Sequence, residues 1–275
     1  MTPATKTLLM LLIVLVSTAN AEDPVDKKEA AAPIAANKNI LKPLVTSKFV
    51  LPLKKEGGLW IDLKRKWVIV DGSVCLREGP LEMFICPAQT KEHESVITTP
   101  VDAETVHTSL LAIGAKTGSP VQFQPEYKRA TGAVIDIVVV WVGEDGKINA
   151  NLGQDWVKKG NTRKTMQYAW VFGGSGYWKN PNTDGRIYYG NDGSLVCLSN
   201  FPTATIDLPV ESSNSNAARL YYANTPQIAP LKTPVRLVFA NRPNVDAMKT
   251  PKVLGAGCVL LETVRNWAKE IGTNN

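Results

Sequence analysis

The stretch that decides the fold runs from residue 74 to residue 116 and reads VCLREGPLEMFICPAQTKEHESVITTPVDAETVHTSLLAIGAK. It contains both histidines of the chain, two of its four cysteines and its clearest helix signal. The segments on either side are rich in β-branched and aromatic residues, which favour strands. We therefore expect an α+β fold, in which a single β-rich domain of mostly antiparallel strands carries one main helix.

The main helix is expected at about residues 102–113. Asp102 is a favourable N-cap, and Gly114 provides the C-terminal stop. The apolar stripe that should face the sheet consists of Val106, Leu110 and Ile113. His107 lies at the edge of this stripe, so its side chain should be half buried.

Two cysteines lie symmetrically about a turn signal at Pro80-Leu81. Cys75 is five residues before the proline, and Cys86 is five residues after the leucine. If proline and leucine form the centre of a turn, the two cysteines face each other on antiparallel strands. Opposed side chains approach the separation that a disulfide needs. We predict a Cys75–Cys86 disulfide, or two buried free thiols if the register slips by one residue.

Further strands are expected at residues 59–62, 67–76, 95–99, 134–142, 195–199 and 235–240. The segment 134–142 is apolar on nearly both faces, as is typical of a central strand. Asp145-Gly146 indicates a tight two-residue hairpin after it. The residue pairs of that hairpin would include Val139 with Leu152 and Trp141 with Ala150.

An aromatic segment follows between residues 166 and 189. Trp170 and Phe172 alternate along one face of a strand and are expected in the core. Tyr177 and Trp178 follow the turn sequence GGSG at residues 173–176. Because Tyr and Trp combine a large apolar face with a polar tip, these two residues are candidates for stacking on a sugar or a peptide.

Residues 1–21 have the features of a secretory signal peptide. Lys6 is the positive n-region, Leu8–Val16 is the apolar h-region, and a small-x-small cleavage pattern ends at Ala21. The apolar run is shorter than the roughly 20 residues of a membrane span. We expect cleavage after Ala21, with a retained anchor as the alternative, and a mature chain without a membrane span in the periplasm or cell envelope.

The rest of the chain divides into three parts. Residues 22–47 form an Ala/Lys/Pro-rich linker, residues 48–242 form the β-rich domain, and residues 243–275 form a C-terminal extension. An amphipathic helix is expected at residues 259–271, and it either docks on the sheet or binds a partner. Its apolar face would consist of Leu260, Val264, Trp267 and Ile271.

The formal net charge is +6 and the pI is about 9.0. Basic residues form short, scattered clusters such as 64–66 and 158–159. Scattered clusters in an exported protein indicate a solvated surface, so no nucleic-acid partner is expected.

His93, Glu94 and His107 are candidate ligands of a metal ion, because imidazole and carboxylate bind zinc, iron and copper. The sequence contains no H-E-x-x-H motif. A strand and a returning helix would leave the two imidazoles more than about 10 Å apart, unless the chain bends near Ser95. A metal site and two structural histidines therefore remain as alternatives.

Other cofactor and catalytic patterns are missing. GGSGY at residues 173–177 fits neither a G-x-S-x-G elbow nor a phosphate-binding loop. The cysteines are dispersed without a C-x-x-C motif, so no iron–sulfur cluster is expected. The sequence does not decide whether Cys197 and Cys258 are free.

Several long motifs, in order, carry a family resemblance: REGPLEMFICPAQTKEHES, VHTSLLAIGAKTGSPVQFQPEYK, QDWV, AWVFGGSGYW and VCLSNFPTATIDLP. Over about residues 49–240 the chain resembles the exported YdjY-domain proteins of planctomycete-type bacteria. The resemblance implies no reaction. Some relatives have a ferredoxin-like name, but this chain lacks cluster-binding cysteines.

The expected function is that of a non-catalytic binding or structural module of the cell envelope. Its partner would be an envelope protein, a peptide or a glycan. The alternative is a metal-dependent or redox enzyme that uses His93, Glu94 and His107.

Overall fold

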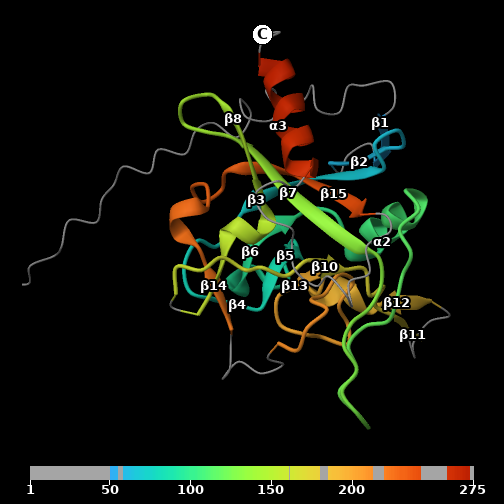
Figure 1. The fold of residues 1–275 in the computed structure, drawn as a ribbon. Helices are drawn as coiled ribbons and strands as arrows, with labels where there is room; N and C mark the ends of the chain where they lie inside the picture. Colours follow the sequence, from blue (N-terminus) through green and yellow to red (C-terminus); the bar gives the residue numbers. More distant parts are fainter. Residues whose placement is uncertain are drawn as a thin grey trace, which may run out of the picture. The chain divides into compact units, whose positions relative to one another are not determined.

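Three long strands form the centre of the main sheet (Figure 1). Strand β15 (Pro234–Arg242) lies between β3 (Trp67–Val74) and β7 (Val134–Val142), and both pairings are antiparallel. All three strands are rich in β-branched residues and are mostly buried. The predicted central strand 134–142 is therefore confirmed.

The computed structural model describes residues 50–54, 58–160, 162–179, 185–212, 220–242 and 259–272. The remaining strands are β1 (Val50–Lys54), β2 (Leu59–Asp62), β4 (Pro80–Leu81), β5 (Met83–Pro87), β6 (Ser95–Thr99), β8 (Ile148–Leu152), β9 (Val157–Lys159), β10 (Trp170–Val171), β11 (Tyr177–Lys179), β12 (Arg186–Tyr188), β13 (Val196–Cys197) and β14 (Tyr221–Ala223). The helices are α2 (Ala103–Ala112) and α3 (Val259–Gly272). The predicted signal segment, linker and Cys258 lie outside the described residues.

The main sheet has different partner strands at the two ends of its central strands. At one end β2 pairs with β3, with β1 outside it, and β10 pairs with β7. At the other end β6 pairs with β3 and is followed by β5 and β13, while β8 pairs with β7. Only the β5–β6 pair is parallel among the strand pairs of the described residues. The expectation of an α+β fold with mostly antiparallel strands is confirmed.

Helix α2 begins and ends as its sequence indicates. The Asp102 carboxylate accepts a hydrogen bond from the Thr105 backbone N–H at 2.7 Å, and Gly114 follows the helix with φ +86°. The buried face includes Val106 and Leu110, which belong to the main hydrophobic core.

Helix α3 covers the opposite face of the sheet (Figure 1). Leu261 and Val264 are buried there, and the Trp267 ring lies 5.7 Å from the ring of Trp67. The guanidinium of Arg265 donates to the Ala150 carbonyl. The helix therefore docks on the sheet, which was one of the two arrangements considered for it.

The predicted hairpin at Pro80-Leu81 is wrong. These residues form β4, which pairs with β14 in a separate small sheet. Strand β6 lies between β3 and β5, so the chain around Cys75 and Cys86 is two strand spacings apart, about 10 Å. A disulfide needs Cα atoms within about 7 Å of each other. Accordingly, both cysteines are free thiols, and the predicted bridge is not formed.

The hairpin between β7 and β8 is shifted by one residue from the predicted register. Its pairs include Val138 with Leu152 and Val140 with Ala150. The Gly143 N–H donates to the Lys147 carbonyl at 2.8 Å, and Gly146 has φ +75°. The loop thus has three residues and ends in a left-handed glycine, where a two-residue turn was expected.

A buried carboxylate links the sheet to the loop that follows β13. Asp207 is fully buried, and its backbone exchanges two hydrogen bonds with Val171 of β10. One carboxylate oxygen accepts from the Leu208 N–H at 2.7 Å and from the Asn200 amide at 3.1 Å. Burial nevertheless raises the pKa of Asp207 to about 7, because the hydrogen bonds only partly replace lost hydration.

This raised pKa predicts a specific dependence of stability on pH. The pKa of Asp207 is higher in the folded chain than in the unfolded chain. The contribution of the protonated Asp207 carboxyl to the free energy of unfolding is therefore complete below pH 4 and is lost as the pH rises through 7. Asp207→Asn keeps an oxygen acceptor and removes the charge. Its free energy of unfolding should equal that of the wild type near pH 4 and exceed it by up to about 4 kcal/mol at pH 8.

Chemical denaturation at pH 4, 6 and 8 measures this difference. The control is Glu126→Gln, because Glu126 lies in an exposed loop. A constant difference between Asp207→Asn and the wild type at all three pH values would contradict the assignment.

Candidate functional site

An exposed two-stranded ribbon carries an unusual concentration of hydrophobic side chains. Strands β11 and β12 pair in antiparallel register, and Tyr189 directly follows β12. Tyr177, Trp178, Ile187 and Tyr189 are 45%, 38%, 37% and 40% exposed, respectively. These are four of the twelve large exposed hydrophobic residues in the described part of the chain. We call β11, β12 and Tyr189 the aromatic ribbon.

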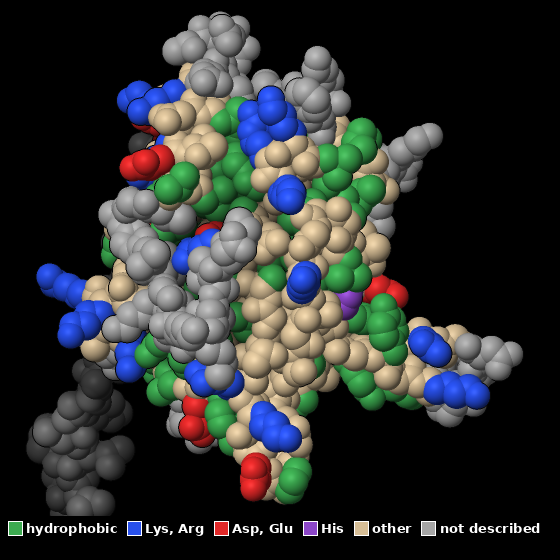
Figure 2. All heavy atoms as spheres, turned by 45° about the vertical axis from the view of Figure 1, so that its right-hand side comes forward, with side chains coloured by type: hydrophobic (Ala, Val, Ile, Leu, Met, Phe, Trp, Pro, Cys, Tyr) green, Lys and Arg blue, Asp and Glu red, His purple; other side chains and the backbone are tan. Residues whose placement is uncertain are grey.

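The two faces of the aromatic ribbon differ. Trp178 lies opposite Ile187, so both side chains are on one face. The Tyr189 ring lies close to Gly176 on the same face and extends the apolar strip. Tyr177 lies opposite Tyr188 on the other face, which is turned toward α2. Figure 2 shows the ribbon as a projecting arm on which hydrophobic and basic side chains gather.

The buried side chain of Tyr188 anchors the ribbon. Its hydroxyl lies 2.8 Å from Nδ1 of His107 and 3.1 Å from the hydroxyl of Thr205, and it donates to the Gly174 carbonyl at 3.2 Å. The side chain is 1% exposed, and burial raises the pKa of its phenol. A buried hydroxyl with three partners fixes the start of the ribbon against α2 and the sheet.

Close backbone packing allows this anchor to form. A side chain at Gly190 would overlap the Thr205 hydroxyl and the Tyr188 ring, where its Cβ would lie 2.3 and 2.7 Å away. Gly174 has φ +91° and lies against Thr117. Glycine is therefore required at both positions for the ribbon to reach α2.

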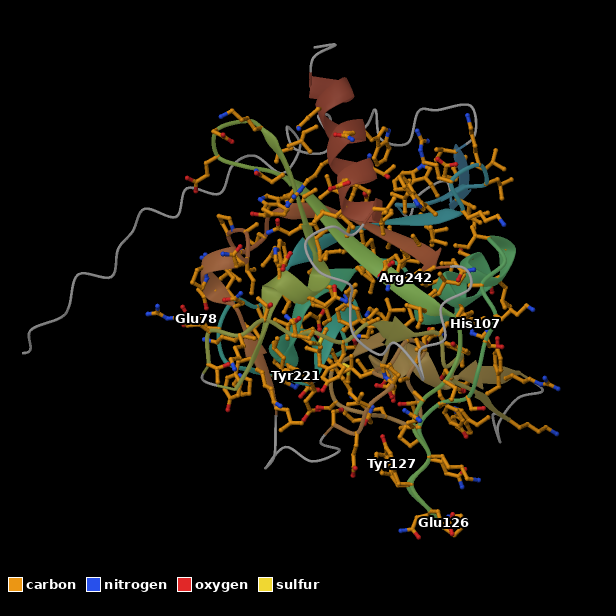
Figure 3. All side chains as sticks on the ribbon, viewed as in Figure 1. Glu78, His107, Glu126, Tyr127, Tyr221 and Arg242 are labelled. Atoms are coloured by element: carbon orange, nitrogen blue, oxygen red, sulfur yellow. The ribbon has the colours of Figure 1, made fainter. Side chains whose placement is uncertain are left out.

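His107 packs between aromatic rings at the base of the ribbon. Its imidazole makes edge contacts with Phe172 and Tyr188, at centroid distances of 4.9 and 5.5 Å. Burial lowers the pKa of His107, so the ring is neutral at pH 7. The half-buried position expected for His107 is observed, and Figure 3 shows the residue on the side of the molecule where β11 and β12 lie.

Tyr177 and Glu104 complete this surface. The Tyr177 hydroxyl donates to a Glu104 carboxylate oxygen at 3.1 Å, and its ring lies 5.1 Å from that of Tyr188. Glu104 is in the first turn of α2, where its backbone N–H donates to the side chain of Asn191. The surface therefore presents an aromatic ring beside a carboxylate and a neutral imidazole.

His93, Glu94 and His107 are not brought together as a ligand set. His93 is 76% exposed in a 3₁₀ turn, and its Nε2 lies 4.0 Å from the carboxylate of Glu94. The Glu94 carboxylate also lies 3.9 Å from Lys91, and burial together with the charge of Glu82 raises its pKa. Within the described ranges, no group of three or more His, Cys, Asp or Glu side chains could hold a metal ion.

The two cysteines of the opening stretch lie on opposite sides of β6, and their side chains approach each other over it. The Cys75 thiol donates to the Ser95 carbonyl at 3.1 Å. Hydrogen bonding from Cys75 lowers the pKa of Cys86 to about 7, while the same contact raises the pKa of Cys75. Cys86 and Cys197 are buried, and burial raises the pKa of Cys197 well above its usual value. This cluster is separate from the aromatic ribbon.

An open groove elsewhere on the surface has mixed charge. It is lined by Tyr127, Lys128, Arg129, Thr131, Pro209, Val210 and Glu211. Figure 3 shows Tyr127 on a loop well away from His107. Its lining combines the basic residues Lys128 and Arg129 with the acidic residue Glu211.

The sequence identified Tyr177, Trp178 and His107, but not Tyr188, Glu104 or Thr205. The sequence IYYG at residues 187–190 gives no local sign of which tyrosine points inward. The one available signal was Gly190, because a glycine beside bulky aromatics often marks a close approach of two chain segments.

Comparison with known proteins gives one match, which is to a family model. Neither the curated proteins nor the solved structures include a match. No helix among the described residues is long and apolar enough to cross a membrane. The family model of the YdjY domain matches residues 59–240, from β2 to the buried part of β15, and so covers α2, the aromatic ribbon and the main sheet except β1. This chain therefore belongs to the YdjY domain family.

Proposed function

We propose that this YdjY-domain protein is an exported, non-catalytic binding module of the cell envelope, and that the aromatic ribbon is its ligand-contact surface. The observation that carries the proposal is the exposure of four large hydrophobic side chains on one short ribbon. Exposed hydrophobic side chains that gather in one place mark interaction surfaces, whereas single ones are ordinary.

The ribbon is also well suited to bind without first changing shape. The Tyr188 hydroxyl fixes one face of β12, and the Tyr189 N–H donates to the Gly176 carbonyl at 2.9 Å. Binding to an ordered surface avoids the entropy cost of ordering it. The ribbon therefore presents exposed hydrophobic side chains on a backbone that is already held in place by hydrogen bonds.

The alternative of a metal-dependent enzyme has less support. It required His93, Glu94 and His107 to converge, whereas Nδ1 of His107 is engaged with Tyr188. A non-catalytic role is also consistent with a projecting ribbon, since enzyme sites are generally concave.

Binding by the ribbon predicts that the wild-type protein co-sediments with an insoluble cell-wall fraction of a bacterium and that variants of the ribbon lose this co-sedimentation. Tyr177→Ala and Trp178→Ala each remove an aromatic face and should weaken binding about 10-fold or more, because a stacked aromatic contributes on the order of 1–2 kcal/mol. Leu63→Ala is the matched control, since Leu63 is 53% exposed outside the ribbon. Circular dichroism confirms that each variant is folded.

Two outcomes of the sedimentation experiment would contradict the proposal. The first is a wild-type protein that stays in the supernatant at all cell-wall concentrations. The second is equal loss of binding in Leu63→Ala and the ribbon variants.

Export predicts a defined mature N-terminus. Expression of the full chain in a bacterium should give a protein that begins at Glu22, because the small-x-small pattern ends at Ala21. N-terminal sequencing of the envelope fraction measures this. Ala21→Arg should block cleavage, since the signal peptidase site needs a small residue there. An uncleaved wild-type chain in the membrane fraction would instead support the retained anchor.

A further inference from the structure

Two thiols whose backbones are too far apart for a disulfide have side chains that meet over β6. Cys75 follows β3, and its backbone N–H donates to the Val96 carbonyl of β6 at 2.9 Å. Cys86 lies on the other side of β6, opposite Thr98. The two side chains are nevertheless in hydrogen-bonding contact. The pair is therefore suited to a bridge that is longer than a disulfide.

A metal ion supplies a bridge of that length. The two sulfur atoms of a disulfide are about 2 Å apart. Two thiolates that bind one metal ion from opposite sides are about 4.6 Å apart, which is twice a metal–sulfur bond of roughly 2.3 Å. Such a bridge links side chains from strands that are not neighbours with less movement of the backbone than a disulfide needs.

The surroundings of the Cys86 sulfur favour the form that binds metals. The backbone N–H of Lys91 and the hydroxyl of Ser95 lie within hydrogen-bonding reach of this sulfur. The Ser95 hydroxyl is buried and has no other partner, so its proton is available to the sulfur. Hydrogen-bond donors stabilise a thiolate, and the thiolate is the metal ligand.

The Cys75 side supplies the entry to this thiol pair. Cys75 is partly exposed, whereas Cys86 is buried. The Cys75 thiol donates to the Ser95 carbonyl at 3.1 Å, and a metal ion takes the place of this proton. When both thiols bind, two S–H bonds break, two metal–sulfur bonds form, and the two protons pass to the solvent.

We propose that Cys75 and Cys86 bind one soft metal ion that accepts two ligands in line, such as Cu(I). Thiolate sulfur selects soft ions. Structural zinc and iron–sulfur clusters need about four ligands. No set of three or more metal-binding side chains is found in the part of the chain that the structure describes. This site is separate from the aromatic ribbon and goes beyond the proposed function.

Anaerobic competition for Cu(I) against the chromogenic chelator bicinchoninate tests the site. The starting protein is the full chain with Cys258→Ser, because Cys258 lies outside the described residues, and it should withdraw one Cu(I) ion. Cys75→Ser and Cys86→Ser in this protein each remove one of two ligands. Each should weaken binding by more than about 100-fold, since changes in the groups around a metal site alone cost about 10–100-fold.

Two controls separate metal binding from folding. Cys197→Ala removes a buried thiol that belongs to another cluster, so this variant should bind Cu(I) as the starting protein does. Ser95→Ala keeps both thiols and removes one donor, so its affinity should fall about 10-fold. Circular dichroism confirms that each variant is folded. X-ray absorption at the copper edge needs no substitution and should show two sulfur neighbours without nitrogen or oxygen.

Three results would overturn the proposal. The starting protein takes no Cu(I) from the chelator, or Cys75→Ser and Cys86→Ser bind as tightly as the starting protein, or nitrogen or oxygen neighbours appear at the copper. Each of these results leaves the proposed function intact. Conversely, Tyr177→Ala should keep its Cu(I) affinity, so a failure of the ribbon to bind a cell wall does not affect the copper site.

Discussion

The structure depends on the pairing of β15 with strands on both of its sides. Its backbone is hydrogen-bonded to β3 and β7, which come from distant parts of the chain. It also carries two largely buried arginines: Arg236 pairs with Asp71 at 2.8 Å, and Arg242 pairs with Asp136. A slip of one residue would move these charges to the opposite faces of the sheet and leave their partners unpaired. The register of the sheet is therefore strongly fixed.

The position of the aromatic ribbon follows from this sheet. Strand β7 pairs with β10 at Trp170–Val171, and the chain then passes His107 through residues 172–176 before β11 begins. The Tyr188 hydroxyl connects the returning strand to the same histidine and to Gly174. The aromatic ribbon is thus a direct extension of the sheet edge, and α2 contributes the side chains at its base.

Features with a local cause could be predicted from the sequence. Helix α2 has its cap, its stripe and its stop glycine within a dozen residues, and the central strands are apolar runs of sufficient length. Tyr177 and Trp178 were identified because they follow a glycine-rich turn. The half-buried position of His107 followed from its place beside the apolar stripe of the helix.

Features that depend on distant pairing could not be predicted. The strand β6 enters between β3 and β5 after a connection of residues 88–94, and parallel neighbours usually need a longer crossover. The symmetric placement of Cys75 and Cys86 about Pro80 therefore suggested a hairpin that does not exist. Likewise, Tyr188 is distinguished from Tyr189 by its contacts with His107, Gly174 and Thr205, which lie 81, 14 and 17 residues away in the sequence.

The central claim is that the aromatic ribbon is an ordered surface held in place by the Tyr188 anchor. The most direct test is the ¹⁵N relaxation of the backbone amides of Trp178, Ile187 and Tyr188 in the protein without a ligand. The account predicts order parameters of about 0.85, equal to those of the central strands β7 and β15. Order parameters below about 0.6 at these three amides would show that the ribbon is not preorganised, and they would contradict the account.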